Sequence, residues 1–283
     1  MSFAGSAETI WQAVMALQQP SLMGFSVEIL PEIDSTNTEL MRRARADRTE
    51  PTLLVAQRQT AGRGRLGRSW DSASGASLTF SLGLLLKPAA WDGLSLAVGT
   101  SLACSLHERI QLKWPNDLWL DGRKLAGILI ETAPAPDGAR YAVLGVGINL
   151  QPRPAQGLST APAALLELWG QADPAHVLER VAAPLLRDVL LFEREGFSAF
   201  ASRFAARDAL QGRQVNVLAT HPGAGPMPPA GAISGTQSVL AATDRSGIAQ
   251  GVNAQGALLL RTAAGVQAIT SSDVSVRPAK AEN

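Results

Sequence analysis

Arginines and glycines alternate in one short polar segment, residues 59–68 (QTAGRGRLGR). Glycine lets the backbone wrap closely around a ligand. Arginine supplies permanent positive charge and a planar set of donors that suits phosphate and carboxylate groups. The residues concerned are Gly62, Arg63, Gly64, Arg65, Gly67 and Arg68. Their types and spacing predict a loop that clamps an anion.

This segment has two other interpretations. Its glycines follow the spacing GxGxxG after an expected strand, which is typical of dinucleotide-binding turns. Such a turn offers only backbone where this chain has arginines, and residues 69–75 do not open the apolar helix that should follow. A solvated basic loop without a ligand stays open as an alternative, because short motifs also arise by chance.

A second candidate segment is residues 113–117 (KWPND), followed by residues 122–128 (GRKLAGI). A tight turn places Asn116 and Asp117 between two expected strands. Lys124 opens an apolar run, where its ammonium group needs an anionic partner. The simpler alternatives are an ordinary Pro-Asn-Asp turn and a lysine at the edge of a strand.

Glycines interrupt a third segment, residues 143–149 (VLGVGIN). A glycine in a strand permits the close approach of another group, and the amide of Asn149 at the strand end could pair with a base edge. Packing is the simpler explanation for this segment alone. In the same way, Ser35 and Thr36 could be helix caps rather than ligand contacts.

Alternating helices and strands must position these residues. Helical spacing and a capping box at Thr36 and Glu39 predict the helices, and short apolar runs predict the strands. Helices are expected at residues 8–18, 36–50, 93–110, 165–169, 177–195 and 197–210. Strands are expected at residues 26–30, 52–57, 78–86, 124–132 and 141–150, with two more flanking Pro115. This alternation predicts a mixed α/β layer architecture.

The pattern changes near residue 211 to short β-like pieces separated by glycines, with residues 258–260 as the clearest apolar centre. We therefore expect one domain over residues 1–210 and a small β domain over residues 211–283. Residues 221–235 are rich in Pro, Gly and Ala and predict a loop.

Composition narrows the class of protein. The 283 residues are 46% hydrophobic and carry a formal charge of +1, without the basic excess of a nucleic-acid binder. The single cysteine, Cys104, excludes a disulfide framework, and its apolar surroundings predict a buried thiol in a reducing compartment. We find neither an apolar stretch of membrane-spanning length nor a signal peptide. A cytoplasmic protein without a membrane partner is expected.

Together these segments resemble the biotin protein ligases in residue type, order and spacing. The resemblance covers residues 34–37 (DSTN), 59–68 with Trp70, 113–117, 123–127 and 145–149, and resumes at residues 247–251 and 255–260. It implies an α/β (α+β) catalytic domain with a mixed sheet, followed by a small SH3-like β-barrel. It also implies a stand-alone ligase that lacks the winged-helix domain of family members that repress transcription.

The activity implied by the resemblance is ATP-dependent biotinylation of a protein. Biotin and ATP with Mg²⁺ would give biotinyl-5′-AMP, and biotin would then pass to a lysine of a biotin carboxyl carrier protein. The implied biotin-binding residues are Ser35, Thr36, Gln59, Gly62, Arg63, Trp70, Lys124, Gly127 and Gly147. The implied ATP and adenylate residues are Arg63, Arg65, Arg68, Lys113, Asn116, Asp117 and Asn149. Lys124, Arg65 and Lys113 would carry the catalysis, and Asp117 would bind the metal.

Two other functions also fit the sequence. A lipoyl-protein ligase would share the fold and the adenylation chemistry, and a nucleic-acid-associated protein would use the arginine loop on phosphates. Residues 1–41 contain no lysine or arginine and five acidic residues, so we expect no binding to DNA. A homodimer is compatible with the resemblance.

Overall fold

The computed structural model describes residues 3–154, 161–219, 245–270 and 274–279. The chain divides into two units, Met1–Ala209 and Leu210–Asn283. The Pro/Gly/Ala-rich residues 221–235, expected to form a loop, lie outside the described residues.

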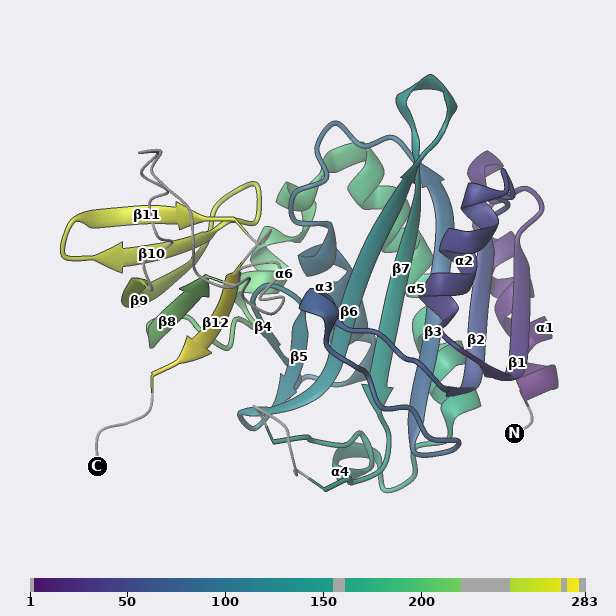
Figure 1. Ribbon diagram of the computed structural model, residues 1–283, viewed down its shortest axis with the longest axis horizontal. Helices are drawn as coiled ribbons and strands as arrows, with labels where there is room; N and C mark the ends of the chain where they lie inside the picture. The colour runs from purple at the N-terminus through teal and green to yellow at the C-terminus, as the bar shows by residue number, and fades with distance from the viewer. Residues whose placement is uncertain (1–2, 155–160, 220–244, 271–273, 280–283) are drawn as a thin grey trace, which may run out of the picture. The chain divides into compact units, whose positions relative to one another are not determined.

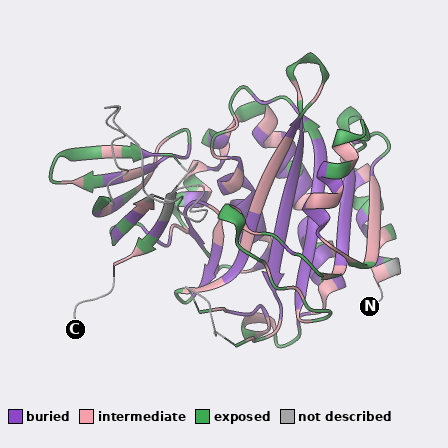
Figure 2. Ribbon diagram, viewed as in Figure 1, coloured by how far each residue is buried: buried purple, intermediate pink, exposed green. Residues whose placement is uncertain are grey.

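A seven-stranded mixed sheet forms the centre of the first unit, in the order β1-β2-β3-β7-β6-β5-β4 (Figure 1). The strands are β1 Ser26–Ile33, β2 Thr52–Gln59, β3 Ser77–Leu86, β4 Gln111–Lys113, β5 Asp117–Leu120, β6 Arg123–Pro134 and β7 Arg140–Asn149. The β1 and β2 strands are parallel, and all other neighbours are antiparallel. The expected mixed sheet is confirmed, and its centre, β3 and β7, is buried along almost its whole length (Figure 2).

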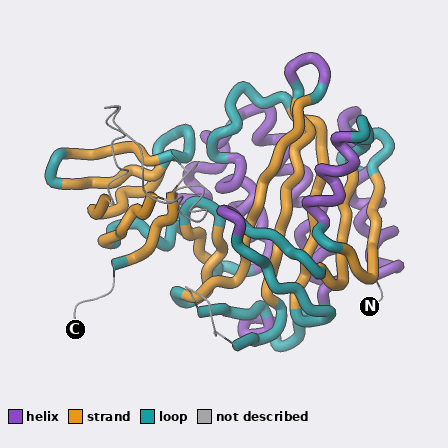
Figure 3. The backbone as a smooth tube through the Cα atoms, viewed as in Figure 1, coloured by secondary structure: helices purple, strands orange, loops and turns teal. Residues whose placement is uncertain are grey.

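Helices cover both faces of this sheet (Figures 1 and 3). The helices are α1 Phe3–Met15, α2 Thr36–Arg45, α3 Leu94–Leu106, α4 Leu166–Trp169, α5 Pro174–Glu195 and α6 Ala201–Ala205. The α3 and α5 helices pack together on one face, whereas α2 lies on the other, beside the long loop that joins β2 to β3. Among the described residues, none of the helices combines the length and the apolar character of a membrane span.

Several predictions about the helices were wrong, and the helix expected over residues 36–50 already ends at Arg45. The helix expected over residues 197–210 ends at Ala205, because the following backbone pairs with β4: Leu112 N donates to Arg207 O at 2.8 Å and Ala209 N donates to Leu112 O at 2.9 Å. Cys104 is exposed rather than buried. The α3 helix already buries Ala103 and Leu106 against its neighbours, and Cys104 is on its outward side.

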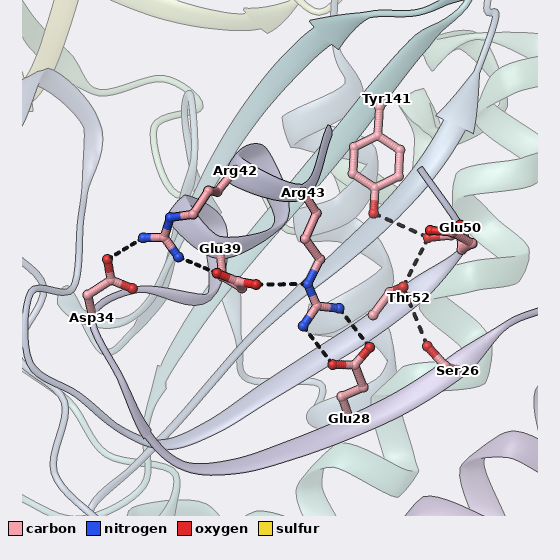
Figure 4. Close-up of polar contacts among 9 residues, drawn as sticks. All are labelled: Ser26, Glu28, Asp34, Glu39, Arg42, Arg43, Glu50, Thr52 and Tyr141. Carbon is pink, nitrogen blue, oxygen red and sulfur yellow. Dashed lines mark hydrogen bonds and ion pairs between the residues drawn. The ribbon is translucent and has the colours of Figure 1, made fainter. Parts of the chain in front are cut away.

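Polar contacts fix α2 to β1 (Figure 4). Arg43 donates to both carboxylate oxygens of Glu28 on β1, at 2.7 and 2.8 Å, and its Nε donates to Glu39 at 2.9 Å. Arg42 binds Glu39 and, at 2.8 Å, Asp34 just before the helix. The expected capping box of Thr36 and Glu39 does not form, because Thr36 is already the first residue of the helix.

The first turn of α2 is capped by Ser35 instead. The Ser35 hydroxyl accepts from Thr38 N at 3.4 Å, and the apolar side of the helix packs on a buried cluster that includes Leu40, Leu54 and Tyr141. The Tyr141 hydroxyl donates to Glu50 O at 3.3 Å, and burial raises its pKa to about 12 (Figure 4). The residues that follow Ser35 are therefore held firmly over the sheet.

The second unit is a five-stranded antiparallel sheet in the order β11-β10-β9-β8-β12. Its strands are β8 Gln214–Ala219, β9 Arg245–Val252, β10 Leu258–Thr262, β11 Gly265–Ile269 and β12 Val274–Pro278. Leu258 and Leu260 are completely buried, as expected for its apolar centre. Strand pairing among the described residues leaves β11 and β12 as the two edges.

Candidate active site

One pocket in the first unit collects most of the residues singled out from the sequence. It has about 460 Å³ of empty space, open to solvent on one side. The start of α2, the end of β2, the β2–β3 loop and strands β3, β6 and β7 form its walls. The expected residues that line it are Ser35, Thr36, Gln59, Arg63, Arg65, Trp70, Asn116, Lys124, Gly127 and Gly147. Segments from across the first 150 residues therefore meet here, as the clamp interpretation requires.

The β2–β3 loop, residues 60–76, folds back on itself at the pocket. Trp70 N donates to Gly62 O at 2.8 Å and Gly64 N donates to Arg68 O at 2.7 Å. A Cβ atom on Gly62 would lie 2.3 Å from Trp70 O, so a glycine is required for the chain to close here. We call residues 62–70 the arginine lobe.

Arg65 reaches from the arginine lobe to the turn between β4 and β5. Its Nη1 donates to Asn116 Oδ1 at 3.2 Å, and Asn116 Nδ2 donates to Ile128 O at 2.8 Å. Asn116 thus links the lobe to the sheet. Arg68 is exposed on the lobe and does not line the pocket.

Two lysines share one carboxylate at the edge of the pocket. Lys124 Nζ lies 2.7 Å from Asp117 Oδ1, and Lys113 Nζ lies 3.6 Å from Asp117 Oδ2. The anionic partner that the sequence predicted for Lys124 is therefore Asp117. Burial lowers the pKa of the Lys113 ammonium group, and the carboxylate of Asp117 acts in the opposite direction. When both lysines are protonated, this cluster carries a surplus positive charge, with Lys124 lining the pocket.

Magnesium was expected at Asp117, and that assignment stays a prediction. Both carboxylate oxygens of Asp117 already face ammonium groups, whose charge opposes a divalent cation. Within the described part of the chain, no group of three or more His, Cys, Asp or Glu side chains could hold a metal.

Trp70 covers two glycines that are register partners on neighbouring strands, Gly127 on β6 and Gly147 on β7. A Cβ atom on Gly147 would lie 2.3 Å from Trp70 Cε2, and one on Gly127 would lie 3.3 Å from Trp70 Cζ3. The sequence predicted close approach at Gly147, whereas Gly127 was named only through the resemblance, and the group that approaches both is the indole ring. The ring gives the pocket an apolar wall, with Lys124 Nζ 5.9 Å from its centroid.

Asn149 is buried at the end of β7, away from the pocket lining. Its Nδ2 donates to Lys124 O at 3.2 Å, which ties β7 to the start of β6.

A buried polar chain that was not predicted runs beneath the pocket. Asn37 Oδ1 accepts from Ser81 Oγ at 2.6 Å, and Ser81 Oγ also lies 2.7 Å from Thr36 Oγ1. Thr36 N and Oγ1 both donate to Gln59 Oε1, at 2.8 and 3.1 Å. The one available signal was Ser81, a hydroxyl inside the apolar strand sequence SLTFSLGLLL.

The pocket thus combines surplus cationic charge, an apolar wall and a hydrogen-bonded floor. It suits a ligand that has an anionic group and an apolar portion, next to a second anion.

Comparison with known proteins agrees with this geometry. Residues 29–149 match the biotin/lipoate A/B protein ligase family, and residues 242–277 match the biotin protein ligase C terminal domain. The bifunctional ligase/repressor BirA of Escherichia coli (strain K12) is 34% identical over 271 residues, covering 92% of this chain and 76% of that protein. The biotin–[acetyl-CoA-carboxylase] ligase of Paracoccus denitrificans is 31% identical, covering 87% of this chain and 98% of that protein.

Structural comparison gives the same result. The biotin protein ligase from Aquifex aeolicus in complex with biotin and ATP superposes with a TM-score of 0.69 at 29% identity, covering 89% of this chain and 99% of that one. The mixed sheet and the C-terminal β unit therefore have the expected family architecture. The chain belongs to the biotin protein ligase family.

Proposed function

We propose that this protein is an ATP-dependent biotin protein ligase. The observation that carries the proposal is the meeting of Lys124 and Arg65 at one pocket that is walled by Trp70. Biotin has a carboxylate on an apolar chain, and ATP supplies the second anion. The relatives named above, and a solved relative with biotin and ATP bound, support this choice over a lipoyl-protein ligase.

In the first step, a biotin carboxylate oxygen attacks the α-phosphorus of ATP. A new carboxyl–phosphate bond forms, the bond to the β-phosphate breaks, and pyrophosphate leaves biotinyl-5′-AMP behind. Lys124 would hold the carboxylate while Arg65 and Lys113 face the phosphates. Preorganised cations at these positions offset the repulsion between two anions and stabilise the developing charge. Mg²⁺ would arrive with the ATP phosphates.

The remaining expected residues take supporting roles in this proposal. Asn116, Asp117, Arg68 and Arg63 would lie toward the nucleotide, and Asn149 toward adenine. The residues proposed to contact the biotin ring are Ser35, Thr36, Gln59 and Trp70. The glycines proposed to leave room for it are Gly62, Gly127 and Gly147.

In the second step, the neutral amine of an acceptor lysine attacks the acyl carbon of the adenylate, and AMP leaves. The enzyme must position the amine and exclude water from the mixed anhydride. Biotin ligases act on biotin carboxyl carrier proteins, so the acceptor belongs to that class. We assign catalysis to residues 1–210 and a separate C-terminal β domain to residues 211–283. Because the reaction consumes ATP, a cytoplasmic location is part of the proposal.

Biotin should support exchange of labelled pyrophosphate into ATP. The assay reports adenylate formation alone, because no acceptor protein is needed. Lipoate in place of biotin should give exchange near the background measured without either acid. Exchange with lipoate but not with biotin would replace this proposal by a lipoyl-protein ligase.

We also propose that this protein does not bind operator DNA. The α1 and β1 elements and the first turn of α2 carry acidic residues and no lysine or arginine as far as Met41. Such a surface repels phosphates. In a fluorescence titration at low salt with biotin and ATP present, we expect no saturable binding to duplex DNA. Sequence-selective binding that weakens steeply with salt would contradict this expectation.

We also propose that the protein forms a homodimer. Light scattering would test this by measuring the mass of the particle in solution.

A further inference from the structure

Arg63, on the arginine lobe, pairs its guanidinium group with a carboxylate. Its Nη2 lies 3.1 Å from Glu131 Oε1, and its Nη1 lies 3.3 Å from Glu131 Oε2. Arg63 Nη1 also lies 3.5 Å from Thr38 Oγ1 on α2. Two parallel contacts between a guanidinium and a carboxylate fix orientation as well as distance. The ion pair therefore joins the arginine lobe to strand β6.

The side chain of Asn37 holds the Glu131 carboxylate in place. Asn37 Nδ2 donates to Glu131 Oε2 at 3.0 Å and to Leu129 O at 3.1 Å. The opposite end of the Asn37 amide accepts from Ser81 Oγ, which fixes which way the amide faces. A Cβ atom on Gly145 would lie 2.1 Å from Asn37 Oδ1, so β7 leaves the space that Asn37 fills.

We infer that Glu131, oriented by Asn37, is the docking point that holds the arginine lobe closed over the pocket by binding Arg63. Glu131 is a positioning residue in this scheme, because it acts on the ligand through Arg63 and the lobe. The inference rests on the proposed function only for its effect on the adenylate.

Two of the three arginines of the lobe, Arg63 and Arg65, then have different tasks. Arg65 contacts Asn116 on the opposite side of the lobe and lines the pocket near Lys124. Arg63 has its guanidinium group on Glu131, so its position at the pocket is set by that carboxylate. The Arg63 side chain is half-exposed, whereas that of Glu131 is 22% exposed, so the pair is partly shielded from water. Such a pair is stronger than a fully solvated one.

Loss of this contact should mainly increase the rate at which biotinyl-AMP dissociates from the pocket. A lobe that opens more often exposes the mixed anhydride to water and lets it leave, while the cations that promote its synthesis stay in place. The expected signature of Glu131→Gln is thus faster loss of bound biotinyl-AMP with a maximal rate of synthesis close to that of the wild type.

Glu131→Gln is the sharpest variant, because its side-chain oxygen can still accept from Asn37 while the charge facing Arg63 is gone. Glu32→Gln is the matched control: Glu32 also pairs with an arginine, Arg58, at 2.7 Å, but on the exposed surface of β1 and β2. Amide hydrogen exchange of residues 62–70, measured without ligand, should be roughly 3- to 10-fold faster in Glu131→Gln and unchanged in Glu32→Gln. Thermal unfolding checks that each variant is folded.

Dilution of preformed biotinyl-AMP complex supplies the second measurement, and its dissociation should accelerate by a similar factor in Glu131→Gln. Arg63→Ala should give the same acceleration, and the double variant should be no worse than either single one. Wild-type exchange rates in the lobe of Glu131→Gln, or additive effects of the two substitutions, would overturn the inference. If the wild-type protein formed no adenylate, the proposed function would fail, while the exchange of the lobe would still report on the docking contact.

Discussion

Replacing Lys124 by alanine should lower biotin-dependent pyrophosphate exchange by about 100-fold or more, as expected for the loss of a preorganised charge. Lys124 lines the pocket together with Arg63 and Arg65, and its Nζ lies 2.7 Å from Asp117 Oδ1. Without it, Asp117 is balanced by Lys113 alone, so the cluster loses its surplus positive charge and the biotin carboxylate loses its cation. The substitution therefore removes the attraction at the reacting group.

Initial rates of exchange at saturating ATP and varied biotin are the appropriate measurement. Lys87→Ala is the control, because Lys87 is exposed at the end of β3 and does not line the pocket. It should leave the rate unchanged. A Lys124→Ala protein within a few-fold of the wild type would show that the lysine is only a charge at a strand edge.

Gly147→Ala should reduce kcat/KM for biotin by about 10-fold or more, since overpacking a filled site costs roughly 1–3 kcal/mol. The new Cβ atom would lie 2.3 Å from Trp70 Cε2 and 2.6 Å from Trp70 Nε1, so the ring must leave its position. The pocket then loses its apolar wall. The Trp70 indole also packs near Gly127, which leaves it little room to retreat in that direction.

Gly64→Ala is a matched comparison within the same site. Gly64 has an ordinary φ of −117°, and a Cβ atom there would meet nothing closer than Arg68 O at 3.5 Å. We expect its kcat/KM for biotin to stay within about threefold of the wild type, as for unstrained surface substitutions. Equal losses in the two alanine variants would mean that the contact with Trp70 is not what Gly147 protects. Near-ultraviolet circular dichroism would follow the displaced tryptophan.

The sequence predicts features that depend on neighbouring residues. Apolar runs locate the strands of the mixed sheet, and the alternation of glycine and arginine locates the loop at the pocket. The sequence predicted an anionic partner for Lys124, which opens an apolar run, and this partner is Asp117. These signals are local, because periodicity and side-chain chemistry act over a few positions.

Features that depend on distant partners escaped prediction. Asn37 and Glu131 form one hydrogen-bonded unit although they are 94 residues apart in the sequence. The expected helix over residues 197–210 stops where the chain finds β4, about a hundred residues earlier. Cys104 lies in a run so apolar that composition alone could not show which side of α3 faces outward. Tertiary contacts decide such cases, and a single sequence does not contain them in readable form.

The two glycines that pack against Trp70, Gly127 and Gly147, have an evolutionary consequence. A glycine codon becomes an alanine codon by a single base change, and at Gly147 every side chain larger than hydrogen removes space beneath the indole. Random drift at this position can only shrink the ligand space. Broadening of the acids accepted must therefore begin at a lining residue that can become smaller, such as Trp70. Substrate range at this pocket can widen at such side chains and cannot widen at Gly147.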